Sequence, residues 1–108
     1  MDNIRKFYGE ELIKFDDFSS SEVSKQFKIE YYKLENDSKD LANRKFGIEV
    51  VKRNCSKNNE IIDKREIINL FDTEEKTEKL LEILQRNKVT PIGLNDVLEE
   101  VFLNKLKE

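Results

Sequence analysis

Histidine is absent from this 108-residue chain, and cysteine, proline and glycine are scarce, with one, one and three copies. Without histidine, the chain lacks the commonest general base and a common metal ligand, and it cannot build a Ser-His or Cys-His nucleophilic pair. The single cysteine, Cys55, can form neither an intramolecular disulfide nor a CxxC zinc site. The three scattered glycines form no phosphate-cradling loop. We therefore expect a protein that is not an enzyme, with no catalytic, cofactor-binding or metal-binding residues.

Long apolar runs are also missing, and charge of neither sign dominates. No run approaches the roughly eighteen apolar residues of a membrane span, and the N-terminal residues lack the apolar stretch of a signal peptide. We expect a cytoplasmic protein that does not associate with membranes. The chain has 20 basic and 23 acidic residues, with a net charge of −3. It therefore has no overall basic field to attract nucleic acid.

Carboxylates are plentiful, so a site built from paired acidic residues needs consideration. Asp96, Glu99 and Glu100 follow one another at i, i+3 and i+4, on one side of an expected helix. They could hold Mg²⁺ or Ca²⁺ weakly, but the chain offers no dedicated binding loop around them. A solvated helix face is the simpler interpretation, and a carboxylate- or metal-dependent enzyme is the least favoured of our functional hypotheses.

The most regular pattern lies near the C-terminus and predicts a helix pair over residues 73–106. Asp72 or Thr73 can cap the first helix, and Asn87 can adopt the left-handed conformation that ends it. Thr90 can cap the second helix, with Pro91 in its first turn. The apolar residues repeat at helical spacing, and we expect the seam between the helices to be formed by Leu80, Leu84, Val97 and Val101.

Residues 25–71 have the alternation of a β-meander. The expected strands are 25–34, 46–53 and 61–70, separated by polar segments with turn chemistry. Gly47, inside the second of these strands, predicts a bulge or a close backbone approach. The third strand contains isoleucine doublets around a charged centre, which indicates either one strand with a bulge or a bend, or two short strands.

Residues 1–24 leave three alternatives open. The apolar positions fit a helical face, while residues 10–15 fit a short strand, and the segment is either a docking arm or an edge strand. With strands first and helices last, we predict one α+β domain over residues 1–108. Its three- or four-stranded antiparallel meander carries the C-terminal helix pair on one face.

Our leading functional hypothesis is a protein–protein contact or a regulatory accessory role. Sheet edges can accept a partner strand, and the sheet face away from the helices would carry aromatic and apolar side chains. The partner is an unknown protein or a second copy of the chain. An equal alternative is that the N-terminal segment covers this face. The residues that we assign to the contact are Phe7, Tyr31, Tyr32 and Val51.

The alternative hypothesis is a nucleic-acid-binding regulator, because two helices joined by a short turn resemble a helix-turn-helix. The second helix would be the reader, but its exposed side is acidic and phosphate would repel it. The basic residues are dispersed, so we regard nucleic acid as the weaker partner class. The residues assigned to this alternative are Lys52, Arg53, Arg65, Arg86 and Lys88.

Two blocks of sequence resemble a known family. Residues 80–84, 87–94 and 96–102, with their Val-Thr-Pro joint and Asp-Val pair, are similar to an uncharacterised family of short proteins from clostridia and related spore-formers, catalogued as a domain of unknown function. The strand 46–50 resembles the "YGIEI" strand of that family. The similarity spans roughly residues 27–102. It implies a lineage and a cytosolic setting but no mechanism.

Overall fold

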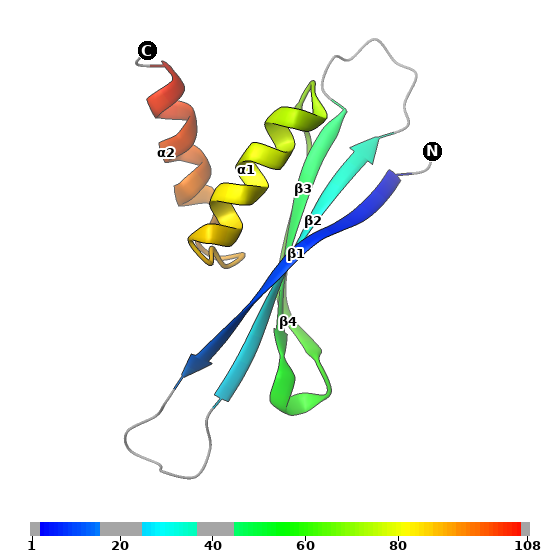
Figure 1. The fold of residues 1–108 in the computed structure, drawn as a ribbon, viewed down its shortest axis with the longest axis vertical. Coiled ribbons are helices and arrows are strands. Elements are labelled where there is room, and N and C mark those ends of the chain that lie inside the picture. The colour runs from blue at the N-terminus through cyan, green and yellow to red at the C-terminus, as the bar shows by residue number, and fades with distance from the viewer. Residues whose placement is uncertain (1–2, 16–24, 37–44, 107–108) are drawn as a thin grey trace.

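A computed structural model describes residues 3–15, 25–36 and 45–106 as a four-stranded sheet followed by two helices. Figure 1 shows both helices on the same side of the twisted sheet. The predicted α+β arrangement, with the helix pair on one sheet face, is confirmed. The elements in chain order are β1 (Asn3–Phe15), β2 (Lys25–Asn36), β3 (Phe46–Asn54), the short 3₁₀ helix η1 (Cys55–Lys57), β4 (Glu60–Phe71), α1 (Glu74–Arg86) and α2 (Leu94–Leu106).

The sheet is an antiparallel meander with the strand order β1-β2-β3-β4. Its first strand resolves one of the open alternatives, because residues 3–15 form an edge strand paired with β2 rather than a helix or a covering arm. The pairing shifts between Phe7 and Gly9, which marks a bulge in the middle of β1. Residues 16–24 lie outside the described residues, and so do residues 37–44 of the polar segment predicted between the first two strands of the meander.

Gly47 is needed where β3 meets β4. The pairing of these strands shifts between Phe46 and Ile48. A Cβ atom on Gly47 would overlap the backbone carbonyl oxygen of Ile67 and would lie 2.9 Å from the Ile68 Cα atom. The close backbone approach predicted at this glycine is therefore confirmed.

The core lies between the helices and the sheet face that they cover, which we call the helix face. Alternate residues of β2 and β3 point into it, because side chains of a strand alternate between its two faces. Leucines of α1 and α2 complete it from the other side. The buried members include Ile29, Tyr31, Ile48, Val50, Leu80, Leu81, Leu84, Leu94 and Leu98.

Local chemistry fixes the start of α1 but not that of α2. The Thr73 hydroxyl accepts a hydrogen bond from the Lys76 amide, 3.2 Å away, as the predicted cap. α2 begins at Leu94 instead of Pro91, and residues 91–93 form a turn in which Pro91 is buried. The left-handed residue after α1 is Lys88 and not Asn87.

Of the four residues predicted for the helix seam, Leu80 and Leu84 are buried in the core cluster and Val97 packs against it, whereas Val101 is half-exposed. Among the side chains of α2 that the structure describes, Leu94 and Leu98 are the ones buried in the cluster. Among the described residues, no helix is long and apolar enough to cross a membrane.

Candidate functional site

The sheet face opposite the helices is the candidate site, and we call it the open face. Within the described residues, both helices pack on the other side of the sheet. The open face is defined by the strand register, because directly paired residues point to the same side. The register places on it, among others, Arg5, Phe7, Glu10, Leu12, Lys28, Glu30, Tyr32, Leu34, Glu49, Val51, Arg53, Lys64 and Glu66. Alternation along β4 extends the same face to Ile62 and Ile68, which lie outside the regular pairing with β3.

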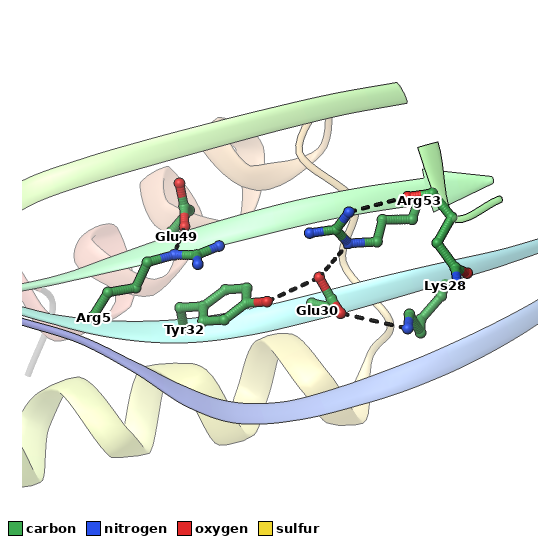
Figure 2. A network of polar contacts seen from close by, with 7 residues as sticks. Arg5, Lys28, Glu30, Tyr32, Glu49 and Arg53 are labelled. Atoms are coloured by element: carbon green, nitrogen blue, oxygen red, sulfur yellow. Dashed lines mark hydrogen bonds and ion pairs between the residues drawn. The ribbon is translucent and has the colours of Figure 1, made fainter. Parts of the chain in front are cut away.

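A three-strand contact occupies one half of the open face (Figure 2). Arg5 on β1 reaches across β2 to β3, where its Nε atom lies 2.5 Å from Glu49 Oε1. On the way its guanidinium covers the Tyr32 ring, with Cζ 3.6 Å from the ring centroid. Phe7 meets the same ring edge-on at a centroid distance of 5.6 Å. Cation–π and edge-to-face contacts of this kind fix the orientation of the ring.

Glu30 is the centre of the other half. Its Oε1 atom accepts hydrogen bonds from the Tyr32 hydroxyl at 2.9 Å and from Arg53 Nε at 2.6 Å. Its Oε2 atom lies 3.5 Å from Lys28 Nζ. Arg53 is itself held by the backbone carbonyl of Asn59, which accepts from Nη1 at 3.0 Å. Figure 2 shows Tyr32 between the two halves, so one ring joins both ion-pair groups.

Glu30 and Glu49 are buried although no other element covers this face in the described part of the chain. Burial favours a higher pKa for Glu30, but hydrogen bonds from Arg53 and Tyr32 outweigh it and bring the pKa below its usual value. Burial and the hydrogen bond to Glu30 raise the pKa of Tyr32. Glu30 is therefore a tightly held carboxylate at neutral pH, and its ion pairs make the face rigid.

Exposed apolar side chains flank this polar centre along both edges of the sheet. Phe7 and Leu12 on β1 are 54% and 49% exposed, and Ile62 and Ile68 on β4 are 48% and 51% exposed. Removing such groups from water is favourable, so each would stabilise a complex if a partner buried it. The open face thus combines a preorganised polar centre with apolar margins.

The four residues predicted for protein contact separate in the structure. Phe7 is exposed on the open face and Tyr32 is half-buried beside it. Val51 points to the same face as predicted, but it is fully buried between Glu30 and Lys64 in the register. Tyr31 lies on the helix face, fully buried in the core, and this corrects its assignment to the contact surface.

The five basic residues assigned to nucleic acid do not meet. Arg53 is on the open face in the Glu30 ion pair, whereas Lys52 and Arg65 point to the helix face from neighbouring strands. Lys52 lies over the ring of Phe27, which is on β2. Arg86 and Lys88 are exposed at the end of α1. The structure therefore assembles no common basic surface from these five residues.

Sequence reasoning missed the polar centre itself. Arg5, Glu30 and Glu49 looked like ordinary exposed charges at alternating strand positions, and their distances along the chain gave no indication that they meet. The register that places β1, β2 and β3 side by side is what brings them together. The only local sign of this site in the sequence was that β2 carries an acidic and an aromatic residue, Glu30 and Tyr32, two positions apart and therefore on the same face.

The described residues bring together no other group of side chains that could bind a metal ion. Histidine, cysteine and acidic side chains form no cluster of three or more that could hold a metal ion within residues 3–15, 25–36 and 45–106. Cys55 is a half-exposed free thiol in η1.

Residues 10–104 match the family described as "Family of unknown function (DUF6514)". No curated protein and no solved structure matches the chain.

Proposed function

We propose that this chain, which belongs to the DUF6514 family of unknown function, is a non-enzymatic protein-binding module that uses its open face. The observation that carries this proposal is the rigid polar centre around Glu30 and Tyr32, flanked by the exposed side chains of Phe7 and Leu12. Preorganised side chains reduce the entropy that a complex loses when it forms, and exposed apolar groups supply the area to bury.

The charges of the open face favour a protein over a polyanion. The face carries four basic and four acidic side chains among the residues whose side chains are described: Arg5, Lys28, Arg53 and Lys64, with Glu10, Glu30, Glu49 and Glu66. Nucleic acid is bound mainly through unpaired cations that neutralise phosphates. Here Arg5 and Arg53 are already held by carboxylates. The matching partner is a folded protein with an apolar contact surface and little net charge.

The setting that we infer is the cytoplasm of a clostridium or a related spore-former. The inference is supported by the resemblance of residues 46–50 and of the Val-Thr-Pro joint to the family described above. A role as an accessory subunit or regulator of the partner fits a small binding module, and we propose it on that ground.

A position-specific crosslinking experiment tests the proposal. A photoreactive residue is placed at Leu12, on the open face, and in a matched variant at Ile92, which is 78% exposed on the α1–α2 joint. Both proteins are irradiated in nuclease-treated lysate of the source cell. We expect one protein to be captured through position 12 and not through position 92.

The captured protein is then purified and titrated with the unlabelled chain. We expect Phe7→Glu to weaken binding at least tenfold, because it places a charge in the apolar contact, and Ile92→Glu to leave binding unchanged. Equal effects of the two variants would reject the open face as the contact. Capture that occurs in untreated lysate but is lost in nuclease-treated lysate would reject the protein-binding function and return attention to Lys52, Arg65, Arg86 and Lys88.

A further inference from the structure

We propose that β4 pairs with the β4 strand of a second copy, antiparallel and centred on Arg65, so that two chains form a homodimer with one continuous eight-stranded sheet. This inference goes beyond the proposed binding function and does not rest on it. The open-face contact involves Phe7 and Leu12 near β1, whereas the dimer uses the opposite edge of the sheet.

The outer edge of β4 has a regular stretch for such pairing. β4 is the last strand of the sheet and contacts β3 on one side, and no described element pairs with its other side. Its register with β3 shifts near both ends, and the uninterrupted part runs over residues 63–67. Arg65 is the middle residue of this part. A two-fold axis through Arg65 therefore aligns two regular stretches of equal length, and an edge of this kind can add a strand.

The open-face side chains of β4 are self-complementary about the same centre. Lys64 and Glu66 are paired with open-face residues of β3, and alternation along β4 extends this face to Ile62 and Ile68 just outside the regular stretch. In chain order the four side chains read apolar, positive, negative, apolar. Antiparallel pairing centred on Arg65 places Lys64 opposite Glu66 of the second copy and Ile62 opposite Ile68. By symmetry each pair occurs twice. Opposite charges and aliphatic pairs in direct cross-strand positions stabilise a sheet.

These side chains are available for a second copy. All four are exposed, and neither Lys64 nor Glu66 makes an ion pair with any residue that the structure describes. Glu66 lies directly opposite Glu49, whose carboxylate is engaged by Arg5 from the far side. A like-charged neighbour is unfavourable, and Lys64 of the second copy would provide the missing positive charge.

The neighbouring registers fit less well. The open-face side chains of both copies must lie on the same side of the joined sheet. The centre of the pairing can therefore move only to another residue, and the neighbouring choices are Lys64 and Glu66. Centring on Lys64 would place Lys64 opposite itself and Ile62 opposite Glu66. Centring on Glu66 would place Glu66 opposite itself and Lys64 opposite Ile68. On the helix face the Arg65 register places the two arginines opposite each other, which is unfavourable, with Asp63 of each chain diagonal to the other arginine, whereas the Lys64 register would place Asp63 opposite Arg65. The Arg65 register is still the best fit, because it alone pairs both the charged and the aliphatic side chains of the open face favourably.

Charge reversal tests the dimer and its register together. The mass of the wild-type chain is measured by light scattering over a concentration series, and we expect a species of twice 12.9 kDa at the upper end. K64E and E66K each place like charges in contact, and we expect each to weaken dimerisation at least tenfold. The double variant K64E/E66K restores opposite pairs and should dimerise like the wild type.

Mixing the two single variants provides the decisive arm. A K64E chain has two acidic residues at the contact and an E66K chain has two basic ones, so the mixture should form heterodimers although each variant alone is monomeric. K79E, in an exposed ion pair on α1, serves as the control and should leave the dimer unchanged. The inference would be overturned by a monomeric wild type, by a dimer that K64E and E66K do not weaken, or by a mixture of the two variants that stays monomeric.

Discussion

The hydroxyl group of Tyr31 donates a hydrogen bond of 2.9 Å to the backbone carbonyl oxygen of Val89, across 58 positions of sequence. The bond joins an inner strand of the sheet to the connection between α1 and α2. Both residues are buried, and Val89 also donates its amide to the Leu84 carbonyl at 2.9 Å. Val89 is thus bonded through both its amide and its carbonyl group, which ties the start of the α1–α2 connection to α1 and to β2.

Removing this hydroxyl group should destabilise the fold. Tyr31→Phe leaves the Val89 carbonyl without its buried donor, which costs about 1–3 kcal/mol of unfolding free energy. Tyr8→Phe is the matched control, because the partly buried Tyr8 hydroxyl makes no hydrogen bond to the described residues. Urea unfolding monitored by circular dichroism measures the unfolding free energy of both variants. Equal stability of the two variants would show that the Tyr31 bond contributes nothing.

Gly47 and Gly93 form a second matched pair. Gly47→Ala pushes a methyl group into the backbone of β4, and overpacking of this kind costs about 1–3 kcal/mol. At Gly93 a Cβ atom would lie 3.7 Å from its nearest neighbour, Thr90 Oγ1, which is an ordinary contact. We expect a lower urea midpoint for Gly47→Ala and little change for Gly93→Ala. A Gly47→Ala midpoint equal to that of the wild type would contradict the close approach.

The Glu30 carboxylate should make stability depend on pH in the acid range. Its pKa in the folded protein is below the ordinary value of about 4.3, so the ionised group stabilises the fold above that pH. This contribution is lost as the pH falls through the lower folded value. Hydrogen bonds to a charged group are worth about 1.5–3 kcal/mol, and Glu30→Gln should cost an amount of this order at pH 7.

The difference in unfolding free energy between Glu30→Gln and the wild type should then become smaller as the pH is lowered below about 4. Thermal unfolding from pH 3 to pH 7 measures it, with Glu82→Gln on the exposed side of α1 as the control. A difference that stays constant over this range would show that the charge of Glu30 is not what stabilises the open face.

The start of α1 gives the last prediction. Thr73→Ala removes the acceptor of the Lys76 amide and should cost about 0.5–2 kcal/mol, while Thr73→Ser keeps a hydroxyl oxygen in place. Helical circular dichroism during urea unfolding distinguishes the two variants. A Thr73→Ser variant as unstable as Thr73→Ala would indicate that the methyl group, and not the cap, matters here.

Much of the fold follows from short-range pattern. Alternation in Phe46, Ile48 and Val50 identified a strand and its buried face, and Thr73 fixed the start of α1 because an N-cap depends on residues within one turn. Gly47 predicted the close approach of another backbone. The absence of histidine and of paired cysteines excluded whole classes of site by residue type alone.

Long-range pairing decided the rest. Alternation could not tell whether residues 3–15 form an arm or an edge strand, because that depends on whether β2 offers a free edge. Alternation put Tyr31 on one face of its strand with Phe27 and Ile29, and Tyr32 on the other, but only the tertiary structure showed that the Tyr31 face is buried in the core and closed to a partner. Arg5, Glu30 and Glu49 meet only because three strands are in register. The chain's own pattern determined the elements and much of the core, whereas the packing of sheet against helices decided which charges became a site.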